Sequence, residues 1–94
     1  MAGIMLVKQA VEDLEHFKAT FNDPALDAVR REHGLVLTGL YHSAEDARTA
    51  IVVMDMEDID RAKRYAASDV LARARSRARA VGPPDAVWFA DREL

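Results

Sequence analysis

Few side chains in this sequence could carry out acid–base chemistry, and two of them lie close together. Arg30 precedes His33 by three residues, which places both on one face of a helix. In a pocket, the Arg30 guanidinium would bind an acidic or enolate oxygen, and the His33 imidazole would transfer protons. We predict Arg30 as substrate-binding and His33 as catalytic. The alternative is that both cations only cap the end of a helix, where positive charge is favourable.

Two further pairs of side chains could complete such a pocket. Tyr41 and His42 end an expected strand and therefore point to opposite faces of its sheet. Either could donate a hydrogen bond or act as a general base, so both are predicted as catalytic, with exposure at a hairpin as the alternative. Tyr65 and Trp88 are predicted to bind substrate by stacking on a flat aromatic molecule, with core or dimer packing as the alternative.

Metal and cofactor chemistry have little support in the sequence. The three histidines, His16, His33 and His42, are not spaced at i, i+3 or i+4, and the chain has no cysteine. The four glycines are scattered, so no phosphate-binding loop is present, and no nucleophile elbow appears. Nothing marks a flavin or haem site either. We therefore expect no metal and no cofactor.

The elements that would position these side chains follow the order β-α-β-β-α-β, with the first helix broken in two. Asp23 and Pro24 begin a helix that Gly34 ends, Asp58 and Ser68 begin two later helical stretches, and Gly82-Pro83-Pro84 ends the last one near residue 80. This order predicts one ferredoxin-like α+β domain over residues 1–94, with a four-stranded antiparallel sheet and helices on one face. The expected strands are 4–11, 35–42, 49–56 and 85–91.

The strands are too apolar for a sheet that exposes one face to solvent. Residues 50–54 are all apolar, and apolar residues of 35–42 would point to both faces. Helices can cover only one face, so we expect the other to pack against the sheet of a second copy in a homodimer.

The stretch RARSRARAVGPP places an arginine at every second position and raises the question of nucleic-acid binding. On a helix, Arg73 and Arg77 lie on one flank of an apolar seam and Arg75 and Arg79 on the other, so they form no single basic face. The chain has 13 basic and 16 acidic residues, and the third strand, TAIVVMDM, lacks the aromatics on which RNA-recognition domains stack bases. We therefore expect no nucleic-acid partner.

The composition also predicts the cellular compartment of the protein. No apolar run reaches the roughly 18 residues that a membrane span needs. The first 13 residues show no basic stretch followed by a long apolar one, so no signal peptide is expected. Together with the absence of cysteine, this predicts a cytoplasmic protein without a membrane partner.

Four stretches of the sequence carry a family resemblance: VEDLEHFKATFND, RREHG, MEDIDRAKRYAASDVLARA and VGPPDAVWF. They resemble the dimeric α/β-barrel proteins, small relatives of the antibiotic-biosynthesis monooxygenases and polyketide cyclases. The resemblance covers nearly the whole chain, mainly at positions that define the fold. It implies a ferredoxin-like protomer, a sheet-to-sheet dimer, and a ligand between the sheet and the helices.

These observations lead to two hypotheses of function. The first is a small cofactor-independent enzyme acting on a hydrophobic, aromatic or polyketide-like molecule of secondary metabolism. It would act as a cyclase, isomerase or monooxygenase, through proton transfer and enolate stabilisation. The second is a non-catalytic homodimer that binds a small ligand or serves as an accessory subunit.

Overall fold

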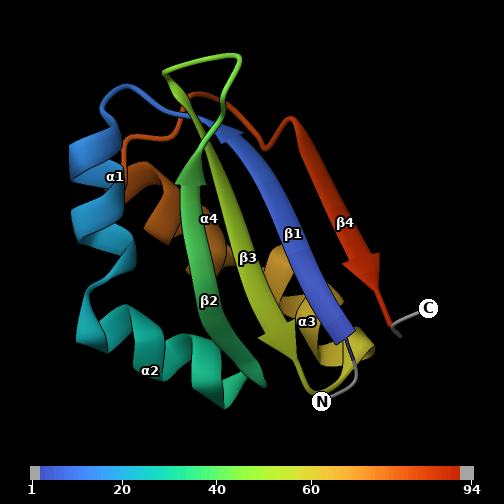
Figure 1. Cartoon of the computed structure of the whole chain (residues 1–94). Coiled ribbons are helices and arrows are strands. Elements are labelled where there is room, and N and C mark those ends of the chain that lie inside the picture. The colour runs from blue at the N-terminus through green and yellow to red at the C-terminus, as the bar shows by residue number, and fades with distance from the viewer. Residues whose placement is uncertain (1–2, 92–94) are drawn as a thin grey trace.

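The four strands pair antiparallel in the order β2-β3-β1-β4, and the helices lie on one face of the resulting sheet (Figure 1). This computed structural model describes residues 3–91. It confirms the predicted βαββαβ order of a ferredoxin-like α+β fold. The elements are β1 (Gly3–Ala10), α1 (Leu14–Phe21), α2 (Pro24–Glu32), β2 (Leu35–His42), β3 (Thr49–Met56), α3 (Ile59–Ala66), α4 (Asp69–Arg77) and β4 (Ala86–Ala90).

Each helix begins at a side chain that accepts hydrogen bonds from its first backbone N–H groups. Asp13 caps α1, and the predicted caps Asp23, Asp58 and Ser68 begin α2, α3 and α4. Gly34 follows α2 with φ of +74°, a left-handed conformation that glycine adopts without the steric cost of a Cβ atom. Short-range capping chemistry therefore sets where the helices start.

The end of α4 differs from the prediction. The helix stops at Arg77 rather than near residue 80, and Arg79 has a positive φ of 58°. The cause is a competing backbone partner at the end of β1. The carbonyl of Arg79 accepts from the N–H of Glu12 at 3.1 Å, and the N–H of Val81 donates to the carbonyl of Ala10 at 2.8 Å. Pairing with the chain beyond β1 thus replaces the last helical turn.

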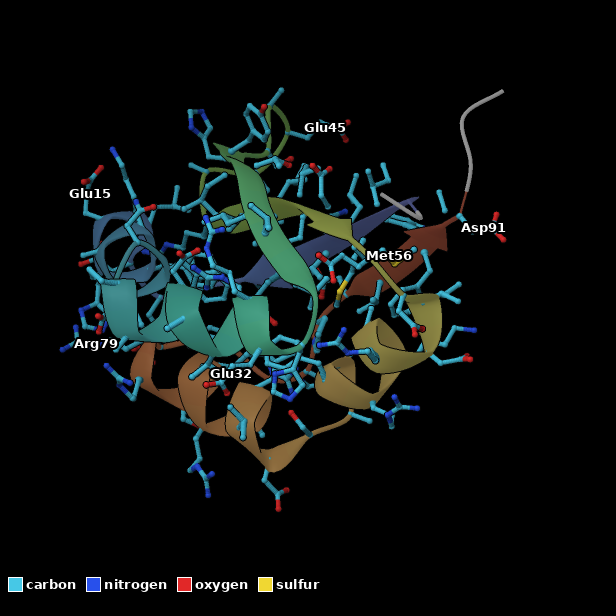
Figure 2. The ribbon with its side chains drawn as sticks, turned by 90° about the horizontal axis from the view of Figure 1, so that it is seen from below. Glu15, Glu32, Glu45, Met56, Arg79 and Asp91 are labelled. Atoms are coloured by element: carbon cyan, nitrogen blue, oxygen red, sulfur yellow. The ribbon has the colours of Figure 1, made fainter. Side chains whose placement is uncertain are left out.

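The two faces of the sheet are apolar, but within residues 3–91 helices cover only one of them (Figure 1). Figure 2, a view from below, shows α2, α3 and α4 on the same side of the sheet. On that side, Met5 of β1 and Val52 and Met54 of β3 are at most 2% exposed. The core also contains Phe17, Phe21, Leu26, Leu35, Met56, Tyr65 and Leu71.

No helix of residues 3–91 lies over the opposite face (Figure 1). Leu6 lies beside Val53 on one neighbouring strand and beside Trp88 on the other, so these side chains share this face. Trp88 remains 55% exposed and Ile4 38% exposed. We call this the open face; it comprises Ile4, Leu6, Lys8, Val36, Tyr41, Ile51, Val53, Asp55 and Trp88.

Within residues 3–91, no helix has the length and apolar character needed to cross a membrane.

Candidate functional site

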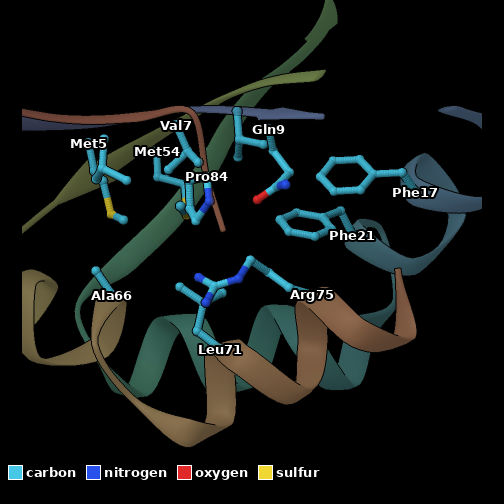
Figure 3. Close-up of a pocket in the computed structure, with 12 residues that line it drawn as sticks. Met5, Val7, Gln9, Phe17, Phe21, Met54, Ala66, Leu71, Arg75 and Pro84 are labelled. Carbon is cyan, nitrogen blue, oxygen red and sulfur yellow. The ribbon is translucent and has the colours of Figure 1, made fainter. Parts of the chain in front are cut away.

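A cavity of about 190 Å³ lies between the sheet and the helices (Figure 3). Strands β1 and β3 form one wall, and α4 forms the wall opposite. The lining is apolar apart from two side chains, Gln9 and Arg75. The residues that line it are Met5, Val7, Gln9, Phe17, Phe21, Val52, Met54, Ala66, Leu71, Arg75, Pro84 and Val87.

The cavity opens to the surface on the side of α4 and β4. Ala66, Arg75, Pro84 and Val87 are partly exposed, whereas Met5, Val52 and Met54 on the sheet are buried. A small molecule would therefore enter beside α4 and reach the sheet at the bottom of the cavity. Such a concave, mostly apolar space with a few polar groups is typical of a ligand site.

Gln9 is a polar side chain buried in the wall that β1 provides. It is 1% exposed, and its Nε2 donates to the carbonyl of Ala10 at 2.9 Å. Its Oε1 has no hydrogen-bond partner within residues 3–91. In Figure 3 this oxygen points into the cavity. A buried acceptor without a partner is unfavourable, and a ligand that donates to it would remove that cost.

Among the described residues that line the cavity, Arg75 is the only charged one. Its side chain leaves α4 beside Leu71 and directs the guanidinium into the cavity (Figure 3). Within residues 3–91, the ion pairs of arginine involve Arg31, Arg61 and Arg77, and Arg75 has none. An arginine without an acidic partner in an apolar cavity suits an anionic oxygen of a ligand.

Two phenyl rings form the aromatic end of the cavity. Phe17 and Phe21 of α1 stack with their centroids 4.3 Å apart and an interplanar angle of 19°. Behind them, the Arg30 guanidinium lies 5.6 Å from the centroid of the Phe21 ring. The aromatic wall is thus held by packing on both sides, which keeps it in place for a flat ligand.

The predicted substrate-binding residue Arg30 lies in the core and does not line the cavity. It is 1% exposed, and its Nη2 donates to the carbonyl of Phe21 at 2.6 Å. Its Nε and Nη1 have no partner within residues 3–91. Burial lowers the pKa of Arg30, because removal from water disfavours the charged form.

Arg30, His33 and Tyr65 are brought together behind the cavity. The His33 and Tyr65 rings lie 4.8 Å apart, and His33 Nδ1 donates to the carbonyl of Val29 at 2.9 Å. Burial raises the pKa of the Tyr65 hydroxyl, while the charges of Arg30 and Arg75 act in the opposite direction. Tyr65 thus lies within the electrostatic influence of both arginines, one in the core and one in the cavity.

The other three predicted residues lie elsewhere. Tyr41 and His42 are exposed at the end of β2 and border a shallow hollow beside α1, together with Leu14, Glu15 and Lys18. Trp88 lies on the open face. None of the six predicted residues lines the cavity, and their roles stay predictions.

Gln9 and Arg75 were not predicted from the sequence as site residues. Arg75 follows Leu71 by four residues, a spacing that places it above a buried leucine on the same side of α4. That spacing could have singled it out among the four arginines. Gln9 offered one signal: it occupies the inward position two residues after Val7 in a strand whose inward side is otherwise apolar.

Comparison with solved structures supports the fold. The chain is similar to the crystal structure of a putative antibiotic biosynthesis monooxygenase from Caulobacter crescentus, with a TM-score of 0.65 and 18% identity over 99% of this chain and 92% of that one. It is also similar to one of the same name from Bordetella bronchiseptica, with a TM-score of 0.68 and 20% identity over 98% and 99% of the two chains. No protein-family model and no curated protein matches the sequence.

The likeness to these two structures confirms the ferredoxin-like fold of the protomer that the sequence resemblance implied. At 18% and 20% identity, it establishes the arrangement of strands and helices and leaves the chemistry to be argued from the site.

Proposed function

We propose that the protein is a small cofactor-independent enzyme that oxygenates a hydrophobic aromatic molecule held between the sheet and the helices. The observation that carries the proposal is Arg75, a cation without an acidic partner in residues 3–91, directed into a cavity whose other lining residues are apolar apart from Gln9. The names of the two similar structures favour oxygenation over cyclisation or isomerisation.

The proposed chemistry begins with an acidic substrate oxygen, a phenol or an enol. Arg75 would stabilise its anionic form, and the apolar walls would strengthen this interaction by excluding water. The electron-rich anion then supplies the electrons that reduce dioxygen. Overall, the reacting carbon, which is a CH2 group in the keto tautomer of the phenol or enol, and O2 give a carbonyl group and water, so atoms and electrons balance without another reductant.

The proton of the substrate would leave through the open side of the cavity. None of the lining residues is a histidine, a tyrosine or an acid, so the lining supplies no general base. Water at the mouth, between α4 and β4, would accept the proton once Arg75 has lowered the pKa of the bound substrate. Arg75 thereby replaces the proton-transfer residues that the sequence suggested.

Oxygen uptake tests this proposal. One-ring phenols and enolisable one-ring ketones would be supplied to the purified protein in an oxygen electrode, with ¹⁸O2 incorporation followed by mass spectrometry. Arg75→Met should lower the turnover rate about 100-fold, the effect of removing a group that stabilises an oxyanion. Arg73→Met, an exposed arginine of the same helix, is the matched control. Unchanged turnover in Arg75→Met would refute the proposed role.

A non-catalytic ligand-binding or accessory protein is the second candidate. The lack of a general base in the cavity lining favours it. The same phenols and ketones distinguish the two functions. A compound that binds in the cavity without oxygen uptake or a new product indicates a binding protein.

We also propose that two copies of the chain pair through the open face. The support is the exposed apolar surface itself, on which Trp88 and Ile4 project from neighbouring strands. Trp88 is the only tryptophan, so its emission reports on this face. We expect a dimer by sedimentation at micromolar concentration and a red shift of the emission when dilution dissociates it. A monomer with concentration-independent emission would contradict the pairing.

A further inference from the structure

The orientation of the Gln9 amide is fixed by the chain around it. Its Nε2 lies 2.9 Å from the carbonyl oxygen of Ala10 and 3.4 Å from those of Val81 and Gly82. Carbonyl oxygens only accept, so the nitrogen must occupy this position and the amide cannot be reversed. Oε1 is therefore held toward the cavity, buried and without a partner in residues 3–91.

Gln9 and Arg75 present opposite hydrogen-bonding characters from opposite walls. Figure 3 shows Gln9 descending from β1 and Arg75 rising from α4. No hydrogen bond joins the two side chains. The Gln9 oxygen requires a hydrogen-bond donor, and a neutral hydroxyl suits it because a cationic donor would be repelled by Arg75 in the same cavity. The Arg75 guanidinium requires an acceptor, preferably anionic. A ligand that satisfies both needs a hydroxyl at one end and an acidic oxygen at the other.

The size of the cavity limits what lies between those two ends. An apolar cavity of about 150 Å³ holds a benzene molecule, and this one measures about 190 Å³. One aromatic ring with two small substituents fits this volume, and a fused polycyclic molecule would exceed it. The stacked Phe17 and Phe21 provide an aromatic surface for such a ring.

We propose that the cavity binds a one-ring aromatic molecule with a neutral hydroxyl and an anionic oxygen at opposite ends of the ring. The hydroxyl donates to Gln9 Oε1, and the anionic oxygen accepts from Arg75. The inference rests on the proposed function only in assigning the substrate to the same cavity. Beyond the proposed function, the inference assigns Gln9 a role in specificity: it selects substrates that carry a neutral hydroxyl in addition to the anionic oxygen.

The test uses binding alone, with 4-hydroxybenzoate as an unreactive probe whose carboxylate represents the acidic oxygen of a substrate. Benzoate lacks the hydroxyl and 4-methylphenol lacks the anion. For the wild type, calorimetric titration should give each of these about a tenfold weaker Kd than 4-hydroxybenzoate, the cost of leaving one polar group unpaired. Shifts of the Val87 and Leu71 methyl resonances would locate the probe in the cavity.

Two variants test separately whether Gln9 causes the preference for the hydroxyl and whether Arg75 causes the preference for the anion. Gln9→Met should bind 4-hydroxybenzoate and benzoate equally while still preferring both over 4-methylphenol. Arg75→Met should lose the preference for the anion while still preferring a hydroxyl. Arg73→Met, on the same helix but outside this cavity, should behave as the wild type.

Three results would overturn the inference. These are equal wild-type affinity for 4-hydroxybenzoate and benzoate, a hydroxyl preference that survives in Gln9→Met, or binding that shifts no cavity methyl group. The wild-type comparison depends on no variant folding. These failures are distinct from failure of the proposed function, which is decided by oxygen uptake with enolisable substrates.

Discussion

The two faces of one sheet carry similar residues but have different surroundings. On strand β3, Val52 is 1% exposed beneath the helices, while its neighbour Val53 lies on the open face beside Leu6. The same contrast holds on β4, where Val87 lines the cavity and Trp88 is 55% exposed. The apolar residues of these strands thus indicate that both faces are buried in the functional protein, whereas the helices within residues 3–91 cover only one face (Figure 1).

The difference also decides where polar groups can act. Lys8 on the open face and Gln9 on the covered face are adjacent in β1. The long side chain of Lys8 can extend past its apolar neighbours to water. The Gln9 oxygen has no such route and remains unpaired within residues 3–91. A hydrogen bond from a ligand to such a group is strengthened by the apolar side chains around it.

Placing a charge on each face in turn should give the largest effects. Val52→Asp buries a carboxylate in an apolar wall, and Arg75 in the same cavity offsets only part of the cost of removing it from water, so we expect a loss of at least about 2 kcal/mol in the free energy of unfolding. Val53→Asp puts the same charge on the open face and should instead convert the proposed dimer to a folded monomer. Urea denaturation and sedimentation measure the two outcomes.

This pair of variants can also contradict the proposed difference between the covered face and the open face of the sheet. If Val53→Asp remains a dimer with wild-type affinity, the open face is not the interface between the copies. If Val52→Asp unfolds no more easily than Val53→Asp, the two faces do not differ in burial as the structure indicates. The circular dichroism of each variant at pH 7 serves as the control for folding.

The sequence predicted the fold well because its signals are local. The bounds of β2 and β3 match the expected strands 35–42 and 49–56, and three helix caps were identified from single side chains. The predicted end of α4 was wrong, because the observed end depends on backbone hydrogen bonds between residues about 70 positions apart, such as Arg79 and Glu12.

The lining of the cavity depends on the same long-range contacts. The Gln9 amide is oriented by the carbonyls of Ala10, Val81 and Gly82, two of which lie more than 70 positions away. Arg75 enters the cavity because of the rotation of α4 against the sheet, which the spacing of arginines alone does not fix. Residue types at the predicted sites indicated possible chemistry but not which side chains would share a cavity.

The two tyrosines give the smallest test of the contrast between the faces. Burial raises the pKa of Tyr65, whereas Tyr41 is 60% exposed on the open face. A hydroxyl with a raised pKa binds its proton more tightly in the folded chain than in the unfolded one. Its stabilising contribution is present below the ordinary pKa of about 10 and is lost as the pH rises above it. The wild type should therefore lose stability above pH 10 more steeply than Tyr65→Phe.

Urea denaturation between pH 7 and 11.5 measures this difference, with Tyr41→Phe as the matched control. Tyr65→Phe keeps the aromatic ring in the core and removes only the hydroxyl, so it should cost little at pH 7. Equal slopes for wild type and Tyr65→Phe would show that water reaches the buried hydroxyl. The cavity beside it would then be wetter than its apolar lining implies, and the electrostatic advantage proposed for Arg75 would be correspondingly smaller.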